Sequence, residues 1–302
     1  MHAWEAAQKT LEYIEEHISD DVSIEDLAEI AALSPFYYQR LFSRLVKKPV
    51  REYIKLRRLA RACGALRETN SRIIDIALEF GFCCHETFAR SFKDTYGITP
   101  MQYRKQVIGV THFEKPDLLL NYVMIDEGVP LISDGLVLEM NRKTLESPAW
   151  YMGKKGYLSD THGKMLGERP GVDESYDIWT DFFKSLDEIP RISGGRRIGS
   201  AYKGDAPSGC TTFFAGIETK TREEKPRFTT WEFPAGEYIV CGFEAEDYNQ
   251  LISSAISKAM KYTKSWLKKH SLTVNGFICE LYYDDAYNSA YMELWIPFKQ
   301  VK

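Results

Sequence analysis

Two short stretches, 36–43 and 85–90, carry side chains that could read the edges of base pairs. Arginine can form two hydrogen bonds with guanine, and glutamine can do the same with adenine. At helical spacing these residues share one outward face, opposite an apolar face. On this outward face lie Phe36, Gln39, Arg40 and Ser43 in the first stretch, and His85, Glu86, Thr87 and Arg90 in the second. The pattern predicts two helices that enter the major groove of DNA.

A simpler interpretation exists for either helix taken alone. Glu86 and Arg90 are four residues apart, so they could form an ordinary surface pair on one helix turn. The same arrangement occurs twice, however, since QRLFSRLV at 39–46 resembles ARSFKDTYG at 89–97. Each stretch lies on the second of two helices that a turn separates, as in a helix-turn-helix. The repetition favours DNA reading over the surface pair.

The sequence predicts helices throughout residues 1–107, and these helices would position the two outward faces. Apolar residues recur every three to four positions from Trp4 to Ile18, which predicts a first helix. Ser23 and Ser34 are suited to begin the second and third helices. A long helix is expected from Pro49 to about Arg67, followed by shorter ones. We therefore expect an all-α first domain with two helix-turn-helix units.

The charge distribution fits this interpretation. The chain of 302 residues has a net charge of −4, but residues 34–108 carry fifteen Lys and Arg against six Asp and Glu. A local basic block of this kind attracts phosphates, although such blocks also occur on ordinary solvated faces. The basic residues near the expected recognition helices are the candidate phosphate contacts: Lys93, Arg104, Arg44, Lys47 and Arg51.

The stretch from Ile76 to Arg104, IALEFGFCCHETFARSFKDTYGITPMQYR, resembles the signature of AraC/XylS-type transcription regulators. The resemblance implies that the outward residues named above face the groove, and that double-stranded DNA is the partner. It also implies that the helix at 49–67 holds the two recognition helices roughly one DNA turn, about 34 Å, apart. The family usually has glycine after the first recognition helix, whereas this chain has Lys47. Either Lys47 is left-handed, which would cost about 1 kcal/mol, or the helix ends differently.

After a predicted linker at 108–118, the residue pattern changes from helical to mostly strand-forming. Residues 119–302 are expected to form an α+β domain in which a unit of two strands, a helix and two strands occurs twice. The expected helices are 174–188 and 247–269. The expected strands are 136–144, 149–157, 197–203, 211–218, 228–233, 237–244, 277–284 and 291–298.

Three motifs of this region, AGEYIV at 235–240, FICELYY at 277–283 and MELWIPFK at 292–299, resemble GyrI-like domains. Such domains bind small, often cationic or amphipathic compounds. The resemblance implies that Glu280 is the acidic residue of an effector site. It also implies that Tyr282, Trp295 and Tyr238 are the aromatic walls of that site. A buried carboxylate with aromatic faces would suit a lipophilic cation.

The alternative is a solvent-facing Glu280 among ordinary strand aromatics. Further wall candidates, each more typical of a core than of a contact, are Trp150, Tyr151, Trp179 and Tyr202.

Other classes of function find little support in the sequence. No apolar run reaches the roughly 18 residues of a membrane span, and we expect no membrane partner. The six cysteines lack a CxxC motif, which favours reduced thiols and a cytoplasmic protein. Cys83 and Cys84 could sense oxidants, but two buried thiols are favoured. No catalytic motif, metal motif or phosphate-binding glycine loop occurs, so neither enzymatic activity nor a cofactor is expected.

We conclude that the sequence predicts a transcription regulator controlled by a small molecule. Two alternatives remain open for its second domain. The domain could hold no ligand and contact a protein such as RNA polymerase or gyrase. It could also be a hydrolase-like domain for small molecules. A cavity lined by aromatic side chains around Glu280 would favour the effector, and a filled core would favour the protein contact.

Overall fold

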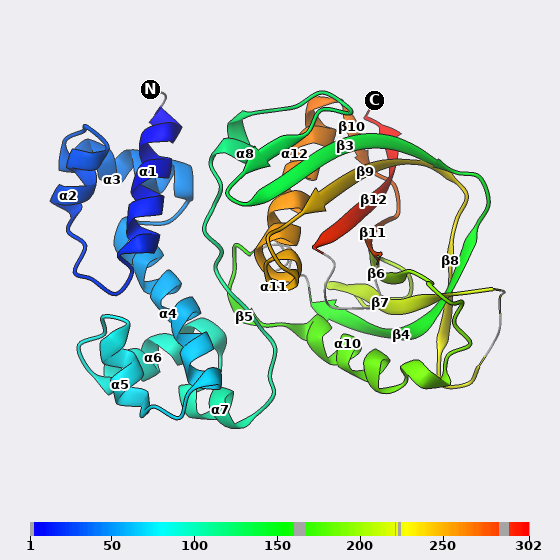
Figure 1. The fold of residues 1–302 in the computed structure, drawn as a ribbon, viewed down its shortest axis with the longest axis horizontal. Helices are drawn as coiled ribbons and strands as arrows, with labels where there is room; N and C mark the ends of the chain where they lie inside the picture. The colour runs from blue at the N-terminus through cyan, green and yellow to red at the C-terminus, as the bar shows by residue number, and fades with distance from the viewer. Residues whose placement is uncertain (1–2, 160–166, 221, 223–224, 284–289, 302) are drawn as a thin grey trace. The chain divides into compact units, whose positions relative to one another are not determined.

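A computed structural model describes residues 3–159, 167–220, 222, 225–283 and 290–301 (Figure 1). The chain divides into two compact units. The first comprises residues 1–122 and 163–173, and the second comprises 123–162 and 174–302. In the part of the chain described, no helix is long and apolar enough to cross a membrane.

The first unit is helical, and helices α1 to α7 agree with those expected from the sequence, whereas its last helix and its two strands were not expected. Two short β-strands pair antiparallel at its end. The helices are α1 (Ala3–Glu16), α2 (Ile24–Ile30), α3 (Pro35–Val46), α4 (Val50–Glu68), α5 (Ile73–Glu79), α6 (His85–Tyr96), α7 (Pro100–Lys105) and α8 (Leu119–Tyr122), and the strands are β1 (Val110–Thr111) and β5 (Gly171–Val172).

Local sequence explains where these helices begin and end. The Ser23 hydroxyl accepts the amide of Asp26 at 3.0 Å and so caps α2. Thr99 and Gln102 form a reciprocal capping box at the start of α7. Lys47 ends α3 in the left-handed conformation, with φ of 62°. A left-handed lysine is therefore present where the family usually has glycine.

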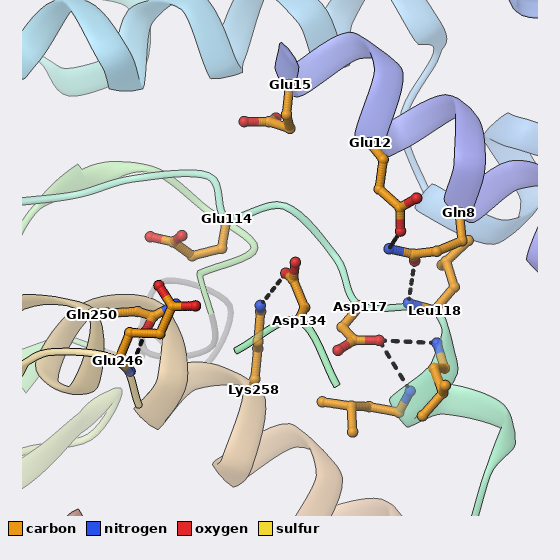
Figure 2. Close-up of polar contacts among 12 residues, drawn as sticks. Gln8, Glu12, Glu15, Glu114, Asp117, Leu118, Asp134, Glu246, Gln250 and Lys258 are labelled. Carbon is orange, nitrogen blue, oxygen red and sulfur yellow. Dashed lines mark hydrogen bonds and ion pairs between the residues drawn. The ribbon is translucent and has the colours of Figure 1, made fainter. Parts of the chain in front are cut away.

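Residues 108–118, expected as a linker, pack against the helices of the first unit. Phe113 and Leu118 are buried in the same apolar core as α1 and α3. The side chain of Gln8 accepts the amide of Leu118 at 3.0 Å, and Asp117 accepts the amide of Leu119 at 3.0 Å (Figure 2). The contacts thus extend this unit to Tyr122, whereas the functional boundaries at 107 and 118 stay predictions.

The second unit is built on a ten-stranded sheet, and each expected strand is present within a few residues. The strands are β2 (Leu131–Ser133), β3 (Leu136–Leu145), β4 (Ala149–Ser159), β6 (Arg197–Tyr202), β7 (Cys210–Thr219), β8 (Thr229–Phe233), β9 (Gly236–Glu244), β10 (Leu272–Val274), β11 (Phe277–Tyr282) and β12 (Tyr291–Gln300). The helices are α10 (Glu174–Lys184), α11 (Tyr248–Gln250) and α12 (Ile256–Lys269), with a 3-10 turn at Leu186–Glu188 and a π-helical turn at Leu251–Ala255.

The strand order confirms the expected duplication. The order is β2-β3-β9-β12-β11-β6-β7-β4-β8, and β10 pairs with β12. One repeat is β3-β4-α10-β6-β7, and the other is β8-β9-α12-β11-β12. The third strands of the repeats, β6 and β11, pair at the centre. The first strand of each repeat pairs with the second strand of the other, β3 with β9 and β8 with β4.

Candidate DNA-reading helices and small-molecule site

Helix α3 has one buried side and one exposed side, as the sequence predicts. Tyr38 and Phe42 are fully buried. Gln39 and Arg40 are exposed, and Phe36 is 71% exposed, which is unusual for so large an apolar side chain. The guanidinium carbon of Arg40 lies 5.6 Å from the Phe36 ring centroid. The outward face of α3 thus combines a cation, an amide and an aromatic ring.

The second helix repeats this division. Phe88, Phe92 and Tyr96 are the buried residues of α6. Its outward residues His85, Glu86, Thr87 and Arg90 are all exposed. Gly97 ends the helix in the left-handed conformation, with φ of 78°. Both predicted recognition helices therefore present the predicted side chains to solvent, except that Ser43 is only partly exposed.

The predicted phosphate contacts Lys93 and Arg104 differ in exposure. Lys93 is exposed near the end of α6. Arg104 on α7 is only partly exposed, and its Nε donates to the carbonyl oxygen of Leu66 at 3.1 Å. This bond attaches α7 to the end of α4. Arg104 therefore has a structural contact that the sequence did not predict.

Arg58 on α4 contacts both helix-turn-helix units, a role that the sequence analysis missed. Its Nε and Nη2 donate to the carbonyl oxygens of Ile18 and Asp20, at 2.8 and 2.6 Å, just before α2. Its Nη1 donates to the carbonyl oxygen of Gly81, at 2.9 Å, in the turn between α5 and α6. Arg58 thereby fixes the loop before α2 and the turn before α6 to one helix. Basic charge was the only signal, and it points equally to phosphate contacts.

A second arginine of α4 is also committed to the interior of this unit. Arg57 donates to the Glu15 carboxylate through Nε at 2.7 Å and Nη2 at 2.9 Å, and to the carbonyl oxygen of Phe113. Burial raises the pKa of Glu15, but hydrogen bonds from Arg57 and Tyr53 outweigh it and leave that pKa below its usual value. Part of the basic block therefore stabilises the fold and does not face DNA.

In the second unit, Glu280 of β11 is buried, with 9% of its surface exposed. Its Oε2 accepts the hydroxyl of Tyr282 at 3.0 Å. Gly199 lies directly opposite on β6, and a Cβ there would be 2.8 Å from Glu280 Oε2 and 3.1 Å from Cζ2 of Trp179. The ring of Trp179 meets that of Tyr282 edge to face at 5.4 Å. Glu280 is thus enclosed by Tyr282 and by Trp179 of α10.

The other two predicted wall residues do not join this group. Trp295 pairs with Cys279, the neighbour of Glu280, so it lies on the opposite face of the sheet. It packs there against Tyr238, with ring centroids 5.4 Å apart, in an aromatic core with Phe233. The four predicted effector residues therefore divide into two pairs, one on each face. Trp179, expected to be a core residue, is the ring near Glu280.

The second face has a carboxylate of its own, Glu293, which is 3% exposed. It accepts Nζ of Lys143 at 2.7 Å. It also accepts the hydroxyl of Tyr291 at 2.6 Å, Nε1 of Trp295 at 2.7 Å and the hydroxyl of Tyr283. Burial raises the pKa of Glu293, but the hydrogen bonds, first that from Lys143, outweigh it and hold the pKa below its usual value.

The motif MELW gave a partial signal for Glu293, since aromatic residues flank this carboxylate in the sequence. Its partner Lys143 lies on β3, in the other repeat, and no local pattern links the two.

The two helices of the repeats are packed unequally. α12 has seven buried residues, among them Tyr262 and Trp266, and its Lys258 pairs with Asp134 at 2.8 Å (Figure 2). In α10 only Phe182 is buried, and Trp179 is partly exposed. Ile178, Trp179 and Phe183 of α10 are partly buried and pack against the same core as Phe182.

Comparison with known proteins identifies the family of the helical unit. A helix-turn-helix domain model matches residues 27–106. Regulatory protein SoxS of Salmonella typhimurium is 36% identical over 100 residues, which are 33% of this chain and 94% of SoxS. The chain belongs to the AraC family of transcription regulators. It is a DNA-binding regulator of that family, as its sequence predicted.

Two further proteins are similar to part of this chain. An uncharacterized HTH-type transcriptional regulator of Bacillus subtilis, YbfP, is 43% identical over 104 residues, 34% of this chain. The chain spans only 35% of the length of YbfP. A solved regulator with an AraC-type domain from Chromobacterium violaceum is 26% identical, with a TM-score of 0.33, over 34% of this chain and 91% of that one.

The strand-rich unit of this AraC-family chain matches a second model. Residues 172–299 match the GyrI-like small molecule binding domain. This region includes α10, Glu280 and Glu293. The expected combination of a helix-turn-helix region with a GyrI-like domain is therefore confirmed.

Proposed function

We propose that a cationic, amphipathic small molecule controls this AraC-family regulator by binding beneath α10, beside Glu280. The observation that carries the proposal is a carboxylate buried to 9% exposure between the rings of Trp179 and Tyr282. A buried carboxylate can balance the charge of a cation that has lost its water. The aromatic faces add cation–π attraction.

The same side of the sheet already accommodates a protein cation. The guanidinium carbon of Arg197 lies 5.4 Å from the ring centroid of Tyr282 and 5.7 Å from that of Phe183. Arg197 is only 6% exposed. Tyr282 therefore already contacts a cation of the protein itself in a setting with little water.

Glu293 is the competing carboxylate, and its surroundings argue against it. Lys143 lies 2.7 Å from it, and three neutral donors occupy its remaining positions. An incoming cation would have to displace Lys143 and break those hydrogen bonds. We therefore assign the effector to Glu280, and we treat Glu293 as a structural carboxylate.

The position of Trp179 supports a route to Glu280. This side chain is partly exposed and stands between solvent and the carboxylate. Its ring contacts with Phe183 and Phe213 would have to loosen for the effector to enter.

We also infer that α3 and α6 read successive major grooves. The outward residues of α3 read one groove through Phe36, Gln39 and Arg40. Those of α6 read the next, and Lys93 contacts a phosphate. The exposure of these side chains, and the three bonds by which Arg58 holds the loop before α2 and the turn before α6, support this arrangement. A contact with RNA polymerase stays a prediction.

Calorimetry with tetraphenylphosphonium and related lipophilic cations tests the effector site. Glu280→Gln should weaken binding by about 100-fold or more, since loss of one partner of a buried charge pair costs about 3–5 kcal/mol. Glu293→Gln is the matched control, and it should leave affinity within a few-fold. Circular dichroism would check the fold of both variants. Equal binding by wild type and Glu280→Gln would reject the assignment, and no binding by wild type would favour a protein-contact domain.

A further inference from the structure

The turn before α6 holds two neighbouring thiols that DNA reading does not use. The sequence analysis favoured burial of both, but Cys83 is exposed and Cys84 is only partly buried. Their sulfur atoms lie 4.0 Å apart. The Cys84 thiol also contacts the hydroxyl of Thr87, one of the outward residues of α6, at 3.2 Å. The pair is thus accessible and directly adjoins the predicted base-reading face.

Three other cysteines, Cys63, Cys241 and Cys279, are buried. Burial raises the pKa of Cys63 and of Cys241 to about 12, and it raises that of Cys279 as well. The side chain and backbone of Thr87 instead hold the pKa of Cys84 below its ordinary value. The thiolate is the form that bonds to soft electrophiles. Cys83 and Cys84 are also more accessible than Cys63, Cys241 and Cys279.

A disulfide within this pair is disfavoured. Neighbouring Cα atoms across a trans peptide are about 3.8 Å apart, whereas disulfides usually join Cα atoms about 4.4–6.8 Å apart. An atom that bonds to both sulfur atoms avoids this strain, because it lengthens the bridge. The 4.0 Å between the two sulfur atoms leaves room for such a bridging atom after a small side-chain rotation.

We propose that Cys83 and Cys84 form a dithiol site that chelates soft, thiophilic electrophiles, with trivalent arsenicals as the ligand class, and that chelation releases α6 from DNA. With phenylarsine oxide, both S–H bonds break and two As–S bonds form. The arsenic-bound oxygen leaves with the two protons as one water molecule, and arsenic stays trivalent.

Release from DNA follows from position. The chelate adds a bulky aryl group one residue before His85 and against Thr87. The N-terminal residues of a recognition helix are those that approach the base edges. This part of the inference rests on the proposal that α6 lies in a major groove.

Intact-mass titration of the full chain with phenylarsine oxide tests the chelate. We expect one equivalent to bind, to resist a monothiol and to be removed by a dithiol. Cys83→Ser and Cys84→Ser should each weaken binding by about 100-fold or more, because one thiol loses the effective concentration of the other. Cys210→Ser is the matched control, and it should bind as wild type does. Wild-type affinity in Cys83→Ser would overturn the dithiol site.

Fluorescence anisotropy with duplex DNA tests the coupling. The arsenical should abolish DNA binding by wild type and by Cys210→Ser, and it should leave each single-thiol variant near the affinity of its own untreated form. Chelation with undiminished DNA affinity would overturn the release from DNA and the groove placement of α6, but not the dithiol site. Failure to chelate would overturn the site and leave the groove proposal intact.

Discussion

Arg58 and Gly81 meet in a contact that only glycine permits. Nη1 of Arg58 donates to the Gly81 carbonyl oxygen at 2.9 Å, and a Cβ on Gly81 would lie 2.6 Å from Cζ of Arg58. Gly81 also has a φ of 71°, in the left-handed region. The turn of the second helix-turn-helix is therefore specified by its backbone conformation and by its arginine together.

Gly81→Ala should accordingly destabilise the protein by more than backbone strain alone. A left-handed alanine costs about 1–2 kcal/mol, and displacement of Arg58 adds about 1 kcal/mol for each lost hydrogen bond. Urea denaturation would measure the change. Gly97→Ala is the matched control, since Gly97 has a φ of 78° with nothing within 4 Å of an added Cβ. Equal losses in the two variants would show that Arg58 contributes nothing.

Arg90 and Lys93 should separate base reading from phosphate binding. Arg90→Ala should lose about 1–3 kcal/mol on the cognate site and much less on random DNA. Lys93→Ala should weaken binding to both DNAs alike and reduce the salt dependence. Anisotropy titrations at two salt concentrations would measure this. Equal losses from Arg90→Ala on the two DNAs would make Arg90 a backbone contact.

Lys143 should stabilise the strand-rich unit in a pH-dependent way. Lys143→Met leaves the buried Glu293 without its cation. The expected cost at neutral pH is about 1–3 kcal/mol, less than for a fully buried pair because Lys143 is partly exposed. The pKa of Glu293 lies below its usual value in the folded state, so the stability that it contributes is present above about pH 4.5. That stability is lost as the pH falls through the folded pKa.

Thermal unfolding from pH 7 to pH 3 would measure this difference. Lys155→Met is the control, because Lys155 pairs with the exposed Asp205 at 2.7 Å. It should cost less than about 1 kcal/mol. A Lys143→Met penalty that stays constant down to pH 3 would contradict the assigned pair.

His112 should make the helical unit sensitive to mild acid. Its Nδ1 contacts the hydroxyl of Tyr96 at 3.0 Å, and burial, with Arg57 and Arg67 nearby, lowers its pKa to about 4. Between the ordinary value of about 6.5 and pH 4, the unfolded chain binds a proton that the folded chain does not. Stability should therefore fall as the pH falls through this window. His112→Gln should flatten that slope in urea denaturation, and an unchanged slope would reject the explanation.

The sequence predicted the elements well because their signals are local. Ser23 and Ser34 mark helix starts, and the alternation in β11 and β12 places Glu280 and Trp295 each on a definite side of its own strand. Whether the two share a face depends on the register between strands, which no local pattern contains. The predicted effector site therefore joined residues that lie on opposite faces.

The missed contacts share the same cause. Arg104 was predicted as a phosphate contact and Arg58 was given no role, because charge is local information, whereas their carbonyl partners are 38 and 23 to 40 positions away in the chain. Lys143 and Glu293 are 150 positions apart. Only the folded chain brings such groups together.

The exchange of strands between the two repeats has a consequence for how the GyrI-like region is made. Val137 pairs with Glu244, and Gly153 with Thr229, so neither repeat has its full set of strand neighbours until the other has been synthesised. Pairings so distant in sequence require large loops to close, which slows folding. During synthesis on the ribosome, β3 and β4 have unpaired edges until β8 and β9 have been made. A nascent chain halted before them would therefore expose edges prone to aggregation.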